Sequence, residues 1–70
     1  FRRVLSDLPE NWVGKTVGQL DIRNKHNINI MAFKHMGVMN MNIKSDTPVP
    51  ENNTMLVLGN IRDIQKCFHI

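Results

Sequence analysis

One short stretch of the chain, residues 17–34, groups residue types that could bind an anion joined to a flat apolar group. It contains a guanidinium at Arg23 and an amide at Asn29, flanked by the aliphatic residues Ile22 and Ile30. A guanidinium binds phosphate or carboxylate through charge-assisted hydrogen bonds, and an amide offers both a donor and an acceptor. The same residues could equally be a surface arginine, a turn asparagine and two core isoleucines, so the rest of the sequence must decide.

The elements that would position these residues are a short helix and the strand into which it turns. Thr16 and Gln19 match a capping box, in which the hydroxyl and the amide satisfy free backbone groups at the start of a helix. Asn27 suits a left-handed residue at its end. Asp21 and Lys25, four residues apart, are expected to pair on the exposed side of this helix.

Residues 28–35 alternate with period two, which predicts a strand. The alternation assigns its residues to two sides, with Ile28, Ile30 and Ala32 on one and Asn29, Met31 and Phe33 on the other. Both sides are largely apolar, so the strand is expected to be central in its sheet. Met36 and Gly37 follow as a turn, because glycine adopts a positive φ at little steric cost.

The remaining segments predict three more strands and a second helix. Residues 1–5 and 54–58 are β-compatible, and residues 38–43 alternate so that Met39, Met41 and Ile43 would face inward. A methionine stripe can form an adaptable binding surface, but core packing is the favoured interpretation here. Asn60 can cap a final helix whose apolar stripe is Ile61, Ile64, Cys67 and Phe68. The predicted fold class is α+β: a small antiparallel (mixed) sheet with two helices, in the order β-α-β-β-β-α.

Size and composition limit the possible classes of protein. A chain of 70 residues forms one small domain, residues 1–70, whose core alone supplies only about 3–5 kcal/mol. The single cysteine, Cys67, excludes an internal disulfide, and the three histidines lack zinc-ligand spacing. Oligomerisation is the remaining way to stabilise such a domain, so we expect a twofold homodimer, which is the commonest symmetry.

The net charge of +3 is spread along the chain rather than gathered on one face. Nucleic-acid-binding domains usually concentrate basic residues among aromatic ones, so no nucleic-acid partner is expected. No apolar run approaches the ~20 residues of a membrane span. The lone cysteine fits a reducing compartment, and a chain that opens on Phe1 without methionine is expected to be a fragment of a longer cytoplasmic polypeptide.

Catalytic constellations are not recognisable in this sequence. Cys67 falls in the apolar stripe of the last helix, where an inert thiol is the default, and the two serines have no histidine at a motif spacing. Gly14-Lys15-Thr16 matches only the end of a phosphate-binding loop and is attributed to chance. We therefore expect a domain that is not an enzyme and has no catalytic cofactor.

The run from Trp12 to Lys34, W-V-G-K-T-V-G-Q-L-D-I-R-N-K-H-N-I-N-I-M-A-F-K, resembles the C-terminal regulatory domain of the TrkA/KtrA family, the RCK C-terminal domain. The most diagnostic part is G-K-T-x-x-x-L-D-x-R followed by N-I in the next strand, and T-M-L-V-L-G-N before the last helix agrees. The resemblance implies an α+β domain that pairs as a twofold dimer. It also implies a cytoplasmic location beneath a membrane-embedded bacterial potassium channel or transporter subunit.

A subset of this family binds cyclic di-AMP in the dimer cleft, through two aliphatic residues, D-x-R, and N followed by an aliphatic residue. The resemblance carries these roles to Val17, Gly18, Asp21, Ile22, Arg23, Lys25, Asn29, Ile30 and Ser45. Gly18 replaces the second aliphatic residue, and Ser45 falls near a proline that lines the site in relatives. Arg23 would bind a phosphate, Asn29 a polar edge, and Asp21 would orient Arg23 or a ribose hydroxyl.

The resulting hypothesis is a domain that binds cyclic di-AMP at a dimer interface and thereby controls potassium uptake. The first alternative is a ligand-independent dimerisation and assembly module of a channel gating ring or a cation/proton antiporter. A weaker alternative is a small basic domain that binds nucleic acid through phosphates, with the steep salt dependence that this implies.

Overall fold

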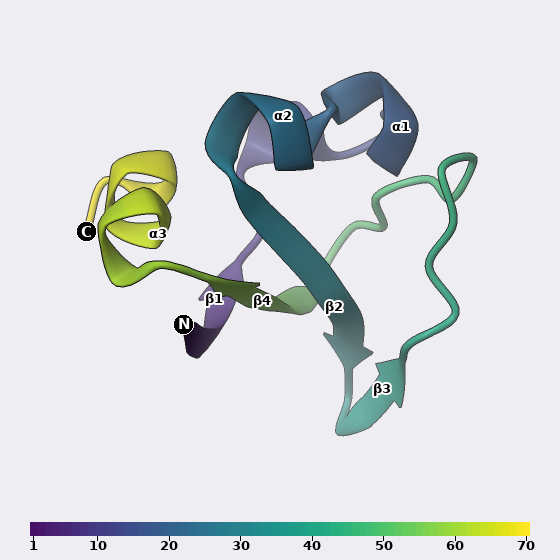
Figure 1. The fold of residues 1–70 in the computed structure, drawn as a ribbon. Helices are drawn as coiled ribbons and strands as arrows, with labels where there is room; N and C mark the ends of the chain where they lie inside the picture. The colour runs from purple at the N-terminus through teal and green to yellow at the C-terminus, as the bar shows by residue number, and fades with distance from the viewer.

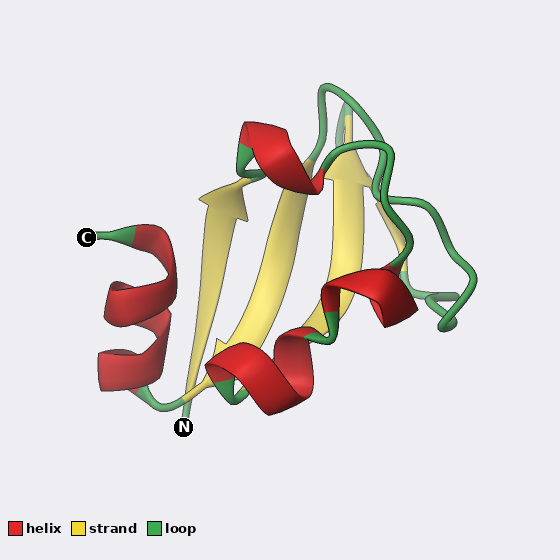
Figure 2. Cartoon of the chain, turned by 90° about the horizontal axis from the view of Figure 1, so that it is seen from above, coloured by secondary structure: helices red, strands yellow, loops and turns green.

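The computed structural model describes residues 1–70 and shows an antiparallel four-stranded sheet with the helices gathered over one of its faces (Figures 1 and 2). The elements follow the order β1 Arg2–Asp7, a 3-10 helix η1 Glu10–Trp12, α1 Val17–Leu20, α2 Ile22–His26, β2 Ile28–His35, β3 Val38–Asn40, β4 Thr54–Gly59 and α3 Ile61–Phe68. The strands lie side by side as β1-β4-β2-β3, and every pair is antiparallel. The predicted α+β class and element order are confirmed.

The helix before β2 begins as predicted but is broken in the middle. Thr16 Oγ1 accepts from the Gln19 amide at 3.1 Å, and Gln19 Oε1 accepts from the Thr16 amide at 2.9 Å, which completes the capping box. Asp21 then takes a left-handed conformation (φ 47°, ψ 45°) and divides the helix into α1 and α2. The expected pairing of Asp21 with Lys25 is wrong, because the Asp21 carboxylate accepts from the Asn24 side chain at 2.9 Å instead. Asn27 ends α2 with a positive φ, as predicted.

Strand β2 is central, as predicted, but the predicted assignment of its two faces is wrong beyond Ile30. Ile30 pairs with Val57 and Ala32 with Leu56, so Met31 is an extra residue that forms a β-bulge. A bulge shifts the alternation by one residue. Phe33 therefore joins Ile28 on the face that carries the helices, while Ala32 lies opposite.

The core lies between the sheet and the helices. Ile28, Met55, Val57 and Ile64 are fully buried, and α3 contributes Ile64 from its predicted apolar stripe. Asn60 caps α3 by accepting from the Arg62 amide at 3.0 Å. None of the helices has the length and apolar character that crossing a lipid bilayer requires.

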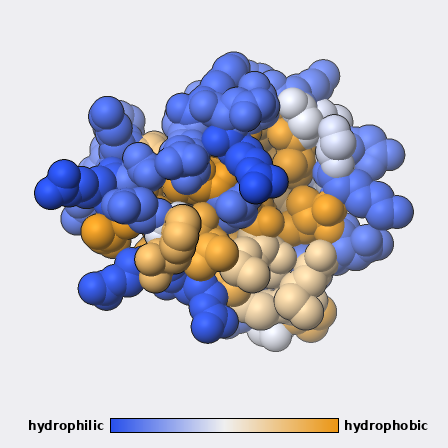
Figure 3. Space-filling model, viewed as in Figure 1, coloured by the Kyte–Doolittle hydropathy of each residue, from blue (hydrophilic) through white to orange (hydrophobic).

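The other face of the sheet and the β2–β3 hairpin leave apolar surface exposed. The prediction that Met39 and Met41 face inward is wrong, since they are 43% and 72% exposed and β3 ends at Asn40. Leu5 on β1 is 48% exposed, because β1 turns this side chain away from the helices. In Figure 3 the apolar surface gathers in the lower part of the view, where Figure 1 places this hairpin.

The edge of β2 is only partly covered by β3. The pairing with β3 involves Phe33, Lys34 and His35, so the first half of β2, including Asn29 and Ile30, has no neighbouring strand on that side. An open edge of this kind leaves backbone groups accessible. The predicted site residues at the start of β2 thus lie beside an uncovered edge of the sheet.

Candidate ligand-binding site

A hollow of about 250 Å³ opens between the broken helix, the start of β2 and the loop that follows β3. Its lining combines five apolar side chains with charged, amide and hydroxyl groups: Val17, Asp21, Ile22, Arg23, Ile28, Asn29, Ile30, Ile43, Lys44 and Ser45. The lining residues come from three separate stretches of the chain, residues 17–23, 28–30 and 43–45. The fold, rather than local sequence, therefore assembles the hollow.

Most of the residues predicted for the site line this hollow. The structure brings together Val17, Asp21, Ile22, Arg23, Asn29, Ile30 and Ser45. Gly18 and Lys25 are not among the lining residues. Lys25 instead lines a smaller hollow between α2 and α3, beside Asp63 and Lys66, so the single chain does not bring it to this hollow and its place in the site stays a prediction.

Three lining residues were missed by the sequence reasoning: Ile28, Ile43 and Lys44. Ile28 was placed on one side of the strand with no role in the site, and it is fully buried and forms part of the apolar floor. Ile43 and Lys44 come from the loop after β3, and no residue spacing in the sequence connects that loop with Arg23. The one signal for this loop was the family resemblance, which placed the neighbouring residue Ser45 in the site.

The lining divides into an apolar floor and a polar rim. Ile22 is 4% exposed and belongs to the hydrophobic core, so it presents only an edge to the hollow. Arg23, Asn29 and Lys44 are exposed, so their charged or amide ends are free to meet a solute. The interpretation of these residues as a surface arginine, a turn asparagine and two core isoleucines is thus partly right. Ile22 is a core residue, while Arg23 and Asn29 converge on one hollow.

Backbone hydrogen bonds hold the loop after β3 tightly against α1. The Gly18 amide donates to the Ser45 carbonyl at 2.7 Å, and the Val17 amide donates to the Thr47 carbonyl at 2.9 Å. A Cβ placed on Gly18 would collide with Ser45 Oγ and would lie 2.9 Å from the Ser45 carbonyl oxygen. Glycine is therefore required at position 18 for this close approach, and it supports the wall of the hollow without lining it.

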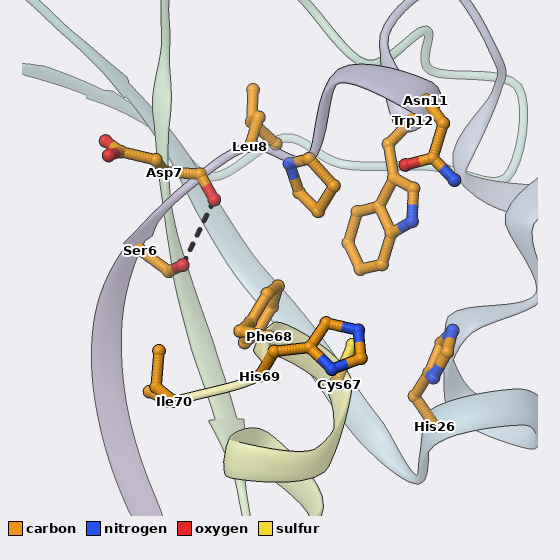
Figure 4. A pocket seen from close by; sticks show the side chains of 11 residues that line it. Ser6, Asp7, Leu8, Asn11, Trp12, His26, Cys67, Phe68, His69 and Ile70 are labelled. Atoms are coloured by element: carbon orange, nitrogen blue, oxygen red, sulfur yellow. Dashed lines mark hydrogen bonds between the residues drawn. The ribbon is translucent and has the colours of Figure 1, made fainter.

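A larger hollow of about 580 Å³ lies at the other end of the molecule, between the end of β1, η1 and the end of α3 (Figure 4). Trp12 forms one wall, with its ring centroid 5.9 Å from that of His26 and 5.8 Å from that of Phe68. Burial raises the pKa of the Cys67 thiol, which keeps the thiol protonated and weakly nucleophilic. No group of three or more histidine, cysteine or acidic side chains is placed to hold a metal ion.

The first hollow combines charged and neutral hydrogen-bonding groups with apolar side chains. Two cationic side chains, Arg23 and Lys44, outnumber the single carboxylate of Asp21, and the Ser45 hydroxyl and Asn29 amide add neutral hydrogen-bonding groups. Beside them lies the apolar floor. This combination suits an anionic group attached to an apolar or aromatic body.

The fold and the hollow define a small α+β domain that carries cationic, amide and apolar side chains around one hollow. The sequence model of the TrkA-C domain matches residues 2–70, and the chain therefore belongs to the TrkA-C domain family. This finding confirms the family resemblance that the D-x-R and N-I spacing indicated.

Comparison with curated proteins finds the K⁺/H⁺ antiporter subunit KhtT of Bacillus subtilis (strain 168). KhtT is 29% identical to the chain over 58 residues, which cover 81% of the chain. The chain spans only 35% of the length of KhtT. The similarity therefore concerns one part of that subunit.

Two solved structures of cyclic di-AMP complexes share the fold. One is the RCK C domain of the potassium transport protein KtrA with cyclic di-AMP, with a TM-score of 0.83 and 22% identity, covering 97% of this chain and 81% of that one. The other is the RCK_C domain dimer of S. agalactiae BusR with cyclic di-AMP, with a TM-score of 0.70 and 14% identity, covering 97% and 93%.

A third similar structure is S. agalactiae BusR in complex with its busAB-promoter DNA, with a TM-score of 0.69 and 14% identity. The match covers 97% of this chain but 35% of the BusR chain. The match shows a shared fold with one part of BusR, and the expectation that the domain has no nucleic-acid partner stays a prediction.

Proposed function

We propose that this domain binds cyclic di-AMP in the hollow beside Arg23, between two copies of the chain, and so regulates potassium transport. The observation that carries the proposal is the convergence of Arg23, Asn29 and Ser45 on one hollow with an apolar floor. The similar KtrA and BusR domains, which were solved with cyclic di-AMP, support the choice of ligand.

The size of the hollow supports a site that is completed by a second copy. Sites that bury most of a small-molecule ligand usually measure ~300–1,000 Å³, whereas this hollow measures about 250 Å³ in one chain. Cyclic di-AMP is itself twofold symmetric, with two phosphates and two adenines. If the twofold axis of a homodimer passed through the ligand, each half of the ligand would contact Arg23 and the apolar floor of one chain.

Regulation would follow from the difference in ligand affinity between two arrangements of the paired domains. A ligand shifts such an equilibrium only by that difference. The transport partner we propose is a membrane-embedded potassium channel or antiporter subunit, and the similarity to KhtT supports the antiporter. The domain would act without catalysis, on the cytoplasmic side of the membrane, with cyclic di-AMP as its regulatory ligand.

Titration calorimetry with cyclic di-AMP tests this proposal on native protein, on Arg23→Ala and on Arg62→Ala. Arg62 lies on α3 and lines neither the proposed site nor the hollow shared by α2 and α3, so it is the matched control. Because a hydrogen bond to a charged group is worth about 1.5–3 kcal/mol, Arg23→Ala should weaken binding by at least about tenfold. Absence of binding heat with native protein, or equal losses in both variants, contradicts the proposal.

The alternative function, a ligand-independent assembly module, is favoured by a separate observation. Leu5, Met39 and Met41 leave apolar side chains exposed on the uncovered sheet face and the hairpin. Exposed apolar surface of this kind is typical of protein–protein contacts. This alternative predicts a stable assembly whose dissociation constant is the same with and without cyclic di-AMP.

A further inference from the structure

Lys44 is a second cation at the hollow, and neither the composition nor the spacing of the sequence pointed to it. It lines the hollow together with Arg23, and it is exposed. The lysine that the sequence reasoning chose, Lys25, lies in the other hollow beside α3. The positive charge of the site therefore comes from two different elements, α2 and the loop after β3.

A closed turn fixes the backbone of Lys44. Its amide donates to Thr47 Oγ1 at 2.8 Å, and its carbonyl accepts from the Thr47 amide at 3.1 Å. The Gly18–Ser45 hydrogen bond ties the same turn to α1. A side chain that starts from a fixed backbone loses less conformational freedom when it binds a ligand than one on a free loop.

The amides of α1 cannot take the place of these side chains. The amides of Val17 and Gly18 donate to the loop carbonyls, and the Gln19 amide donates to Thr16 Oγ1. The amides of these three α1 residues are therefore not available to an anion in the hollow, which leaves its cationic side chains as the charged partners. Asp21, the one acidic residue of the lining, accepts a hydrogen bond from the Asn24 side chain, and the two cations still leave the hollow with a net positive charge.

We propose that Lys44 is a second phosphate-binding residue of the hollow, held in place by the Gly18–Ser45 contact. The ligand that it selects carries two phosphodiester groups, each with one negative charge. The inference rests on the proposed function. Two copies would supply two Arg23 and two Lys44 side chains to two phosphates, so that each phosphodiester meets one guanidinium and one ammonium. The compact ammonium adds charge, while the guanidinium gives direction to the contact.

The test compares cyclic di-AMP binding by Lys44→Met, Lys44→Arg and Lys66→Met in the native background. Each Met variant removes one lysine charge and keeps a long side chain. Lys66 is exposed on α3 and does not line the hollow, so Lys66→Met is the matched control. Lys44→Met should weaken binding by about three- to tenfold, since an exposed charge contact is modest but occurs twice. Lys44→Arg should restore most of the affinity, and Lys66→Met should change it by less than about twofold.

The salt dependence gives a second readout. Affinity should fall less steeply with added NaCl in Lys44→Met than in native protein, because one screened contact is gone. Equal affinities and equal salt slopes in Lys44→Met and Lys66→Met overturn the inference while leaving the proposed function intact.

Failure of the proposed function is a distinguishable result. If native protein gives no heat with cyclic di-AMP, inorganic pyrophosphate is titrated instead. Its binding is monitored by the NMR chemical shifts of the backbone amides. Shifts at Arg23, Lys44 and Ser45 that vanish in Lys44→Met support Lys44 as an anion-binding residue despite the loss of the proposed ligand. Absence of such shifts in native protein overturns the inference.

Discussion

Gly18 and Ser45 shape the site together, although they lie 27 positions apart in the sequence. The family resemblance places an aliphatic residue at the first position and a proline near the second, so both residues depart from the pattern. The structure connects the two departures, because the Gly18 amide meets the Ser45 carbonyl at 2.7 Å and leaves no room for a Cβ. Val17 remains as the single aliphatic wall at this point.

Replacing Gly18 with alanine should therefore destabilise the domain. The added Cβ would meet Ser45 Oγ and the Ser45 backbone, and crowding of this kind typically costs about 1–3 kcal/mol. The free energy of unfolding measured with urea should fall by this amount. The loss should be smaller in a Ser45→Ala background, since one of the two clashing groups is gone. An equal loss of unfolding free energy in both backgrounds would show that the Ser45 hydroxyl does not limit the space for a Cβ at position 18.

At the scale of elements, local signals predicted boundaries well. Thr16 with Gln19, Asn27 and Asn60 act at helix ends through groups within four residues, so the sequence contains the whole interaction. The two-residue turn at Met36-Gly37 is also present, with positive φ at both residues, which is typical of a tight hairpin.

Features that depend on a distant partner were not predictable in this way. The bulge at Met31 exists only in the pairing of β2 with β4, and it reverses the face of every later residue in β2. Lys44 enters the site only because its loop bonds to α1. The core assignment of Met39 failed because alternation shows which side chains share a face but does not show whether anything covers that face.

The cap of α3 gives a test of an element that lies apart from the site. Asn60→Ala removes the side chain that accepts from the Arg62 amide, and loss of such a cap costs about 0.5–2 kcal/mol. Thermal or urea unfolding should show this loss, whereas affinity for cyclic di-AMP should stay within about twofold of native. A large loss of affinity would mean that α3 contributes to the site, contrary to the lining of the hollow.

For the whole molecule, two surfaces remain uncovered in one chain. One is the hollow beside the open first half of β2, and the other is the apolar face with Leu5 and Met39. A domain of 70 residues has a small core, and domains of this size often gain stability from association. Ligand binding and assembly are therefore expected to be coupled in this domain.

The stoichiometry of binding tests that coupling most directly. A site shared across a twofold axis requires one cyclic di-AMP for two chains, so calorimetry on native protein should give about half a ligand per chain, as the symmetry of a dimer requires. Sedimentation velocity should show the dimer fraction rising with ligand, because a ligand that binds only the dimer stabilises it by about 2.7 kcal/mol at a hundredfold excess over Kd. Arg23→Ala should keep the ligand-free dimer fraction and lose the ligand-induced rise. A stoichiometry of one ligand per chain, with a monomer at every ligand concentration, would mean that the hollow acts alone and that the shared site is wrong.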